Sequence, residues 1–243
     1  MKPKIINISD LHGSLPEIKA DFDLMCIAGD ICPTCDHSYT FQKAWIRDVF
    51  IPWINELPFR TPYAKVILIA GNHDFYLEQA GQNITMLKLD FKHGTNGRCI
   101  YLQHESYTFD YLDEDSNTVR RIEIFGTPYT HYCGLWAFMK YDDELKLKFE
   151  DIPEGLDILI THDAPNLNGH GVINYGTNRY KNVGCQPLAD AILEKKPKYC
   201  VCGHIHTGNR ELTKVEGEDI WTCNASLKND YYMDVFEPII FEI

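Results

Sequence analysis

The chain has 243 residues, of which 44% are hydrophobic and 24% are charged, and its formal net charge is −12 at pH 7. This composition is typical of a folded globular protein, and the negative charge argues against a broad basic face for nucleic acid. No apolar run approaches the ~20 residues that a membrane span needs, and the N-terminus lacks the pattern of a signal peptide. We therefore expect a single domain over residues 1–243, in the cytoplasm, with no membrane partner and no extended nucleic-acid surface.

Five short apolar runs, each ending abruptly in polar residues, organise the chain. They cover residues 4–8, 24–28, 66–70, 156–160 and 199–202. Runs of this length, rich in β-branched residues and closed by glycine or a polar turn, predict strands that are buried on both faces. Residues 41–57 and 186–195 carry apolar side chains at helical spacing and predict helices. Strands that alternate with helices predict an α/β core with parallel strands.

Two other stretches depart from this alternation. Residues 106–112 and 118–125 flank an acidic segment and predict a β-hairpin. Its tip resembles the start of a calcium loop, but Thr118 stands where glycine is needed and Ile124 where a bidentate glutamate is needed, so we expect a solvated turn. Residues 165–184 show no recognisable element, and a loop of that length in a compact domain is usually functional or mobile.

The nine cysteines follow no framework pattern. Cys32-x-x-Cys35 and Cys200-x-Cys202 have no partner pair at the spacing of a zinc ribbon. Because the number is odd and no export signal is present, we expect buried or loop thiols that stay reduced in a cytosol.

The polar residues after the five apolar runs form the chemical signal of the sequence. They supply seven candidate metal ligands: Asp10, His12, Asp30, Asn72, His162, His204 and His206. Groups at the carboxyl ends of parallel strands collect at one edge of the sheet. Carboxylate, imidazole and amide groups together suit manganese, iron, zinc or nickel. In Asp-x-His and His-x-His, an extended backbone would point both side chains to the same side. A bridging carboxylate would hold two metals ~3.5–4 Å apart, which suits displacement at phosphorus.

Each fragment alone is common, but their order resembles a known family. D-x-H, G-D, G-N-H-D, H and G-H-x-H, from Asp10 to His206, resemble the calcineurin-like metallophosphoesterases. Segments 125–128, 136–138, 183–185, 202–206 and 224–226 are similar to the small MPPED-type (metallophosphoesterase-domain) phosphodiesterases. One departure is Asp163-Ala164-Pro165, where Gly-Pro-Pro is expected after the histidine, so the loop that follows could shape a different pocket.

The resemblance implies an α/β (α+β) fold of four layers, a β-sandwich of two mixed sheets flanked by helices. It implies that one metal is held by Asp10, His12, Asp30 and His206. The other is then held by Asp30, Asn72, His162 and His204. His73 would protonate the leaving oxygen or stabilise the transition state, and Asp74 would either orient that imidazole or cap its own turn.

We therefore expect an enzyme with two divalent metals, manganese in the first place. It would hydrolyse a small phosphodiester, such as a cyclic nucleotide, through a metal-bound hydroxide. The alternatives are a phosphomonoesterase or a protein phosphatase of the same superfamily, a nuclease, and a non-catalytic metal-binding scaffold. Protein phosphatases place an aspartate and an arginine soon after G-D, where this chain has residues 31–34 (I-C-P-T). The acidic composition disfavours a nuclease.

Four residues beyond the metals are candidate substrate contacts: Tyr129, His131, His170 and Arg179. An aromatic face could stack a nucleobase, and Arg179 could meet a phosphate. Ordinary loop packing stays open as the alternative for each of them.

Overall fold

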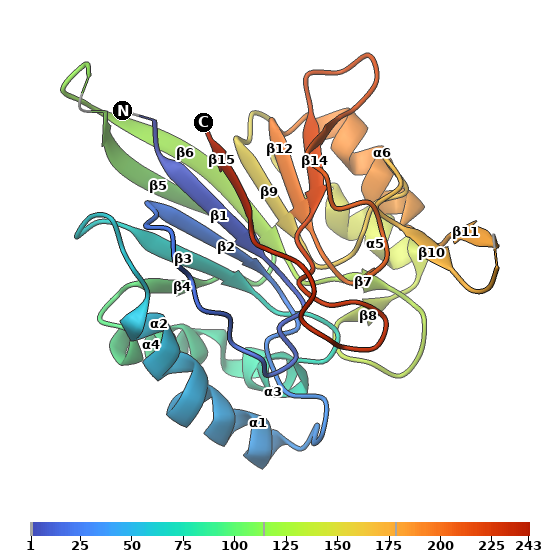
Figure 1. Cartoon of the computed structure of the whole chain (residues 1–243), viewed down its shortest axis with the longest axis horizontal. Helices are drawn as coiled ribbons and strands as arrows, with labels where there is room; N and C mark the ends of the chain where they lie inside the picture. The colour runs from blue at the N-terminus through green and yellow to red at the C-terminus, as the bar shows by residue number, and fades with distance from the viewer. Residues whose placement is uncertain (1, 114, 178) are drawn as a thin grey trace.

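Two large mixed β-sheets packed face to face form the centre of the computed structural model, which describes residues 2–113, 115–177 and 179–243 (Figure 1). One sheet has the order β15-β1-β2-β3-β4. Its strands are β1 (Lys4–Ile8), β2 (Leu24–Ala28), β3 (Lys65–Ile69), β4 (Cys99–Tyr101) and β15 (Ile239–Glu242). The other has the order β13-β14-β12-β9-β6-β5. Its strands are β5 (Glu105–Asp113), β6 (Thr118–Thr127), β9 (Ile158–Thr161), β12 (Tyr199–Cys202), β13 (Thr213–Lys214) and β14 (Trp221–Asn224).

Two small strand pairs, six α-helices, a π-helical turn (Ile46–Phe50) and a 3₁₀ turn (Gly81–Asn83) complete the described elements. The pairs are β7 (Thr130–His131) with β8 (Met139–Lys140), and β10 (Val172–Asn174) with β11 (Tyr180–Asn182). The helices are α1 (Tyr39–Trp45), α2 (Ile51–Glu56), α3 (Phe75–Ala80), α4 (Ile84–Gly94), α5 (Asp142–Phe149) and α6 (Gln186–Lys195).

Side chains that alternate along the central strands separate three hydrophobic cores and so create the four layers. Ile5 and Ile67 point toward the second sheet, where they pack with Ile124 and Val201. The neighbours of Ile5 and Ile67 along each strand face the helices α1, α2 and α4 instead. On the far side of the second sheet, Leu159 packs against α5 and α6. The expected sandwich of two mixed sheets flanked by helices is confirmed (Figure 1).

The direction of the strands determines where polar residues can meet. Strands β1 to β4 run parallel to one another, and so do β6, β9, β12 and β14. Within the described residues of the two large sheets, antiparallel strands lie only at the edges: β15, β5 and β13. The loops that leave the carboxyl ends of the parallel strands therefore share one end of the sandwich.

The helix expected over residues 41–57 is present but interrupted. Between α1 and α2, Ile46–Phe50 form a π-helical turn, in which the Ile51 N–H donates to the carbonyl of Ile46. Pro52 follows directly, and in a regular α-helix its ring would clash with the carbonyl four residues earlier. A wider turn relieves that clash, and such turns occur inside helices as single insertions.

The expectation of a structureless loop over residues 165–184 is wrong. Val172 pairs with Asn182 and Asn174 with Tyr180 in the antiparallel β10–β11 hairpin. Its strands have three residues each, and their side chains are largely exposed. Strands this short and this exposed lack the apolar alternation by which a sequence reveals them.

Two smaller expectations are confirmed. At the tip of the β5–β6 hairpin the Asp113 carboxylate accepts hydrogen bonds from the Asp115 N–H and the Ser116 hydroxyl, a polar turn. All nine cysteines lie in the described part of the chain as free thiols, Cys35 and Cys133 exposed and the others buried. Within the described residues, the helices are too short or too polar to cross a bilayer.

The π-helical turn provides a stability test with a neighbouring control. Phe50 is fully buried against the first sheet, whereas Val49 beside it is 42% exposed. We expect Phe50→Ala to lower the free energy of unfolding by about 3–5 kcal/mol, because the cavity adds to the lost transfer energy. Val49→Ala should change it by less than about 0.5 kcal/mol. Urea unfolding followed by circular dichroism measures both, and equal losses would contradict the packing described.

Candidate metal centre

The candidate ligands lie on five loops that leave the carboxyl ends of neighbouring strands. Asp10 follows β1, Asp30 follows β2, Asn72 follows β3, His162 follows β9 and His204 precedes His206 after β12. Both sheets therefore contribute to one site. The two aspartates, Asn72 and His162 are buried, with at most 2% of each residue exposed.

Left-handed backbone conformations turn these loops back over the strand ends. Asp10, His12, Asp30 and His204 have φ angles of 57°, 45°, 53° and 68°. The expectation that an extended backbone aligns Asp10 with His12 is therefore wrong, since a sharp turn brings them together. Non-glycine residues in this region cost roughly 1–3 kcal/mol each. The turns are held by backbone hydrogen bonds between loops, from Asp10 N–H to the Gly29 carbonyl and from His12 N–H to the Asp30 carbonyl.

Two glycines of the sequence motifs allow the loops to approach the ligands closely. A Cβ atom on Gly71 would lie 2.2 Å from Oδ1 of Asp30, and one on Gly203 would lie 2.6 Å from Oδ2 of Asp10. Cβ atoms essentially never come so close to other atoms, so a larger residue would displace the Asp30 carboxylate at Gly71, and Ser9 together with the Asp10 carboxylate at Gly203. The glycine in G-N and in G-H thus has a packing reason beside its sequence pattern.

One group of ligand atoms comes from Asp10, His12 and His206, which lie within 4.8 Å of one another. Nε2 of His12 is 3.3 Å from Nε2 of His206, which is 3.4 Å from Oδ1 of Asp10. Nδ1 of His206 is 3.1 Å from the carbonyl of Asn229 and donates to it. That bond leaves the lone pair of a neutral His206 on Nε2, directed at the carboxylate.

A second group comes from Asp10, Asp30 and His162. Nδ1 of His162 donates to the Ala28 carbonyl at 2.7 Å, so its Nε2 faces Oδ1 of Asn72 at 2.9 Å and Oδ2 of Asp30 at 3.4 Å. Three acceptors therefore converge on one point, which requires a proton or a cation. Burial opposes a proton there, but the carboxylates of Asp30 and Asp10 outweigh it and raise the pKa of His162 to about 10. A divalent cation fits this position in place of the proton.

The imidazoles of His12 and His204 are ready to act as neutral ligands. Burial lowers the pKa of His12 and of His204 to about 4. His204 differs from the other ligands in position, because its ring centroid lies 5.2 Å from that of His162 and its imidazole stands outside the two groups above. Its backbone N–H donates to both oxygens of Asp10 at 3.1 Å.

His73 lies at the same centre. Its backbone N–H donates to Oδ1 of Asp30 at 2.7 Å. One ring nitrogen of His73 lies within 4.8 Å of ligand atoms of His12 and Asp30. The ring packs on Trp136, with centroids 4.5 Å apart, and burial lowers its pKa.

Asp74, expected to orient His73 or to cap its own turn, joins two loops. Its carboxylate accepts hydrogen bonds from the backbone N–H groups of Gly71, Ile31 and Cys32. These bonds fix the loop that carries Asn72 against the loop that carries Asp30. Nδ1 of His73 is instead 3.2 Å from Nε2 of His37.

Of the four candidate substrate contacts, the structure brings one beside the ligands. His131 lies with its ring centroid 6.1 Å from that of His204, and its Nδ1 is 2.9 Å from the buried carboxylate of Asp163. This contact engages the aspartate that stands where glycine was expected.

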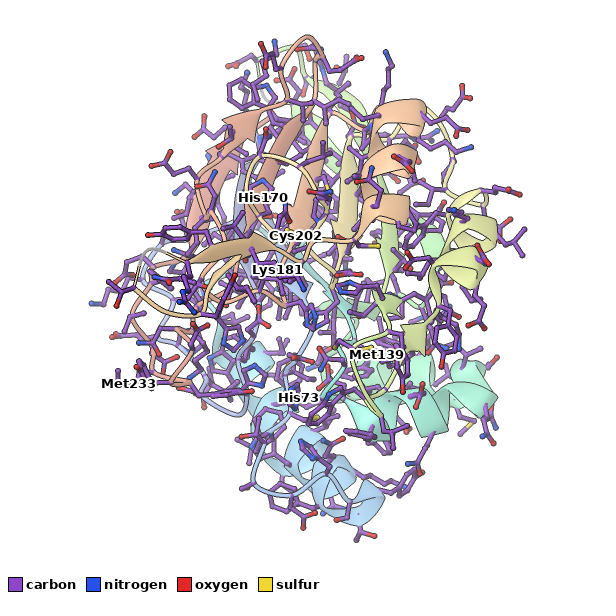
Figure 2. The ribbon with its side chains drawn as sticks, turned by 90° about the vertical axis from the view of Figure 1, so that its right-hand side faces the viewer. His73, Met139, His170, Lys181, Cys202 and Met233 are labelled. Atoms are coloured by element: carbon purple, nitrogen blue, oxygen red, sulfur yellow. The ribbon has the colours of Figure 1, made fainter. Side chains whose placement is uncertain are left out.

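The other three lie elsewhere. His170 is fully buried, with one ring nitrogen on the carbonyl of Asn209 and the other on the hydroxyl of Thr222. Figure 2 shows His170 well apart from His73. The fold therefore uses His170 as a structural residue, and the expectation of a substrate contact is corrected. Tyr129 packs in the core beneath Lys148, and Arg179 is exposed beside the turn between β10 and β11.

A cleft of 290 Å³ opens over the centre, and two aromatic residues form its walls: Trp136, from segment 136–138, and Tyr232, which no motif indicated. Tyr232 packs against His12 and His206, with ring centroids 4.8 and 5.2 Å away. Trp136 stands on the His73 side. Tyr232 lies in a turn with a φ of 58°, and an isolated turn after the last motif offers no periodic signal.

Comparisons with known proteins agree with this geometry. The family model described as calcineurin-like phosphoesterase matches residues 3–208. The human metallophosphoesterase domain-containing protein 1 is 28% identical over 99% of this chain and 71% of its own length. A UPF0046 protein of Caenorhabditis elegans is 28% identical over 100% of this chain and 81% of its own.

Solved structures show the same fold at low identity. The phosphopantetheinyl hydrolase from Mycobacterium tuberculosis superposes with a TM-score of 0.52 at 16% identity, covering 93% of this chain and 89% of that one. A Thermus thermophilus protein gives 0.51 at 12% identity, covering 92% and 89%. Since the family model spans the whole ligand set, from Asp10 to His206, the chain belongs to the calcineurin-like phosphoesterases, a family of metal-dependent phosphoric ester hydrolases.

Proposed function

We propose that the protein hydrolyses a small phosphodiester, in the first place a cyclic nucleotide, with two divalent metals at its centre. The position of Asp30 carries this proposal. Its Oδ2 lies 3.7 Å from Nε2 of His12 and 3.4 Å from Nε2 of His162, so one carboxylate stands between the two groups of ligands. A carboxylate placed in this way can bridge two cations.

The charges of the centre require cations before a phosphate can bind. Asp10 and Asp30 are both buried, and although burial opposes ionisation, the surrounding imidazoles lower the pKa of both carboxyls. Two buried carboxylates repel a phosphoester, and the chain has a net charge of −12. Held by these residues, two divalent ions would reverse the local sign and supply the Lewis acidity of the reaction.

His73 is placed to handle the proton of the leaving oxygen. It lines the cleft, lies beside Asp30 and His12, and has one ring nitrogen occupied by His37. The other nitrogen, Nε2, is left to face a substrate. An imidazole in this position can transfer its Nε2 proton to the oxygen whose bond to phosphorus breaks.

The shape of the cleft supports a small substrate. Its 290 Å³ lies at the lower end of the range for small-molecule sites. Trp136 and Tyr232 offer aromatic faces on two sides of the ligands, and base stacking on such faces is sequence-tolerant and favourable. A cyclic nucleotide combines one phosphodiester with one flat base, which matches this arrangement.

The ligand chemistry supports manganese as the metal, since mixed carboxylate, imidazole and amide donors suit it. We also propose a reducing compartment, the cytoplasm, because nine thiols remain unpaired.

Metal dependence gives the first test of the function. EDTA should abolish hydrolysis of bis(4-nitrophenyl) phosphate, and Mn²⁺ should restore it. Loss of a group that only hydrogen-bonds to a metal ligand lowers activity by ~10–100-fold. Asp30→Asn should lower activity by more, because Asp30 would contact both metals. Asp110→Asn, at an exposed acid of the β5–β6 hairpin, is the control. Full activity of metal-free protein would refute the mechanism.

The role of His73 gives a second test. His73→Ala should lower kcat on a cyclic nucleotide by roughly 10²–10⁴, with both metals retained by elemental analysis. The loss should be smaller for a nitrophenyl ester, whose leaving group needs no proton. His93→Ala, on the exposed side of α4, serves as the control. A variant that loses metal but keeps its turnover per occupied site would show that His73 is a ligand.

Substrate class gives a third test. We expect kcat/KM to be higher for a cyclic nucleotide or another small diester than for the corresponding monoester. Double-stranded DNA should be digested little at moderate salt, because the surface is acidic and the cleft small. Initial rates measured with Mn²⁺ at one pH compare the three substrates. Faster cleavage of monoesters than of every diester would leave a phosphomonoesterase.

A further inference from the structure

We propose that His37 is a positioning residue for His73, holding the imidazole in the one orientation that presents Nε2 to the substrate. The inference rests on the proposed function, since it concerns how His73 reaches the leaving oxygen. Nε2 of His37 is 3.2 Å from Nδ1 of His73, and the ring centroids are 5.3 Å apart. His37 is half-buried and belongs to none of the sequence motifs described above.

The backbone of His73 is already fixed on both sides. Its N–H donates to Asp30, and its carbonyl accepts from Nε2 of Gln42, a fully buried residue of α1, at 2.8 Å. Oε1 of Gln42 accepts from the Tyr76 N–H at 2.8 Å, so the amide orientation of Gln42 is determined as well. The freedom that remains at His73 is rotation of its ring.

Packing alone does not select the orientation of that ring. Trp136 contacts the His73 ring with centroids 4.5 Å apart, and an aromatic contact of this kind accepts either of two ring positions related by a half-turn. A hydrogen bond to Nδ1 distinguishes them, because the half-turn replaces Nδ1 by a carbon. His37 provides this bond, and Asp74 does not, since its carboxylate serves three backbone N–H groups.

Two ring contacts and its place in the chain restrict the position of His37. Its ring packs on Phe75 at 5.1 Å and edge-on against Trp136 at 5.7 Å. In the chain it comes directly before Ser38, whose side chain accepts a hydrogen bond from the Phe41 N–H at the start of α1. Helix α1 and the residue before its N-cap therefore contact His73 at two points, Gln42 at its carbonyl and His37 at its ring.

The protons of the pair balance in a simple way. When the His73 Nδ1–H donates to Nε2 of His37, the proton of His37 lies on Nδ1. For the reaction His73 takes a second proton from solvent on Nε2, which makes it an imidazolium. This N–H bond then breaks as the O–H bond to the leaving oxygen forms, and the neutral Nδ1–H tautomer is restored. His37 exchanges no proton in this step, which makes it a positioning residue.

Two substitutions separate the hydrogen bond from the packing. His37→Phe keeps a ring against Phe75 and Trp136 but removes the nitrogen, whereas His37→Gln keeps an acceptor at similar reach. We expect His37→Phe to lower kcat on a cyclic nucleotide by about 10- to 100-fold, comparable to the cost of losing the hydrogen-bond partner of a metal-bound histidine. His37→Gln should restore it to within about threefold. Metal content should not change.

Leaving groups and a double variant make the test specific. His37→Phe should lower kcat on a nitrophenyl ester much less than on the cyclic nucleotide. In a His73→Ala background it should have no further effect, because the two residues act as a unit. Equal losses on both substrates, no loss at all, or multiplied losses in the double variant would overturn the positioning role.

An NMR measurement tests the positioning role of His37 independently of the proposed phosphodiesterase activity. In Zn²⁺-loaded protein, long-range ¹H–¹⁵N NMR should show His73 as the Nδ1–H tautomer in the unmodified chain. In His37→Phe that assignment should be lost or become a mixture, and in His37→Gln it should return. This result would stand even if the unmodified protein hydrolysed no diester, which would refute the proposed function alone. An Nε2–H tautomer in the unmodified chain, or the same tautomer in all three proteins, would refute the positioning role.

Discussion

Two carboxylates buried side by side, Asp10 and Asp30, are the constraint on which the arrangement of this end of the sandwich depends. A buried carboxylate without partners costs several kcal/mol, so each must be compensated. The compensating groups come from both sheets: the His204 N–H donates to Asp10 and the His73 N–H donates to Asp30. Nε2 of His162 and of His206 faces a carboxylate oxygen, where a proton or a cation completes the contact. Loops of the second sheet are thereby tied to loops of the first, and the site and the contact between the sheets become one structure.

That compensation also explains why the backbone is strained where it is. The carboxylates meet only because residues such as Asp10 and Asp30 adopt positive φ, at a cost that the rest of the fold must offset. Asp74 contributes by joining the Asp30 and Asn72 loops through three N–H groups. Its burial and the charge of Asp30 raise the pKa of Asp74 to about 6, so the ionised form of this link carries an electrostatic cost. The strained backbone and the buried carboxylates lower stability here but place the ligands, as is typical of functional sites.

The sequence predicts the central strands well, because strands that are buried on both faces consist of continuous runs of apolar residues. The runs at 4–8, 24–28 and 199–202 agree with β1, β2 and β12 to the residue. Ligands next to these runs follow from the topology, whereas the turn that joins Asp10 to His12 does not, since positive φ in a non-glycine residue has no pattern. His37 and Tyr232 could not be predicted either, because they reach the centre by tertiary packing from loops without periodicity.

The origin of the cleft walls suggests how chemistry and selectivity are divided in this fold. The ligands come from loops at the ends of buried parallel strands, whereas Trp136, Ile173 and Tyr232 come from connections and a short hairpin. The turn of Tyr232 is nevertheless coupled to the metal centre. Asn229 donates its backbone N–H to the Met233 carbonyl within that turn, and its own carbonyl accepts from Nδ1 of His206. We therefore expect a change in this turn to move the Tyr232 ring and the His206 imidazole together, whereas Trp136 and Ile173 lie outside this turn.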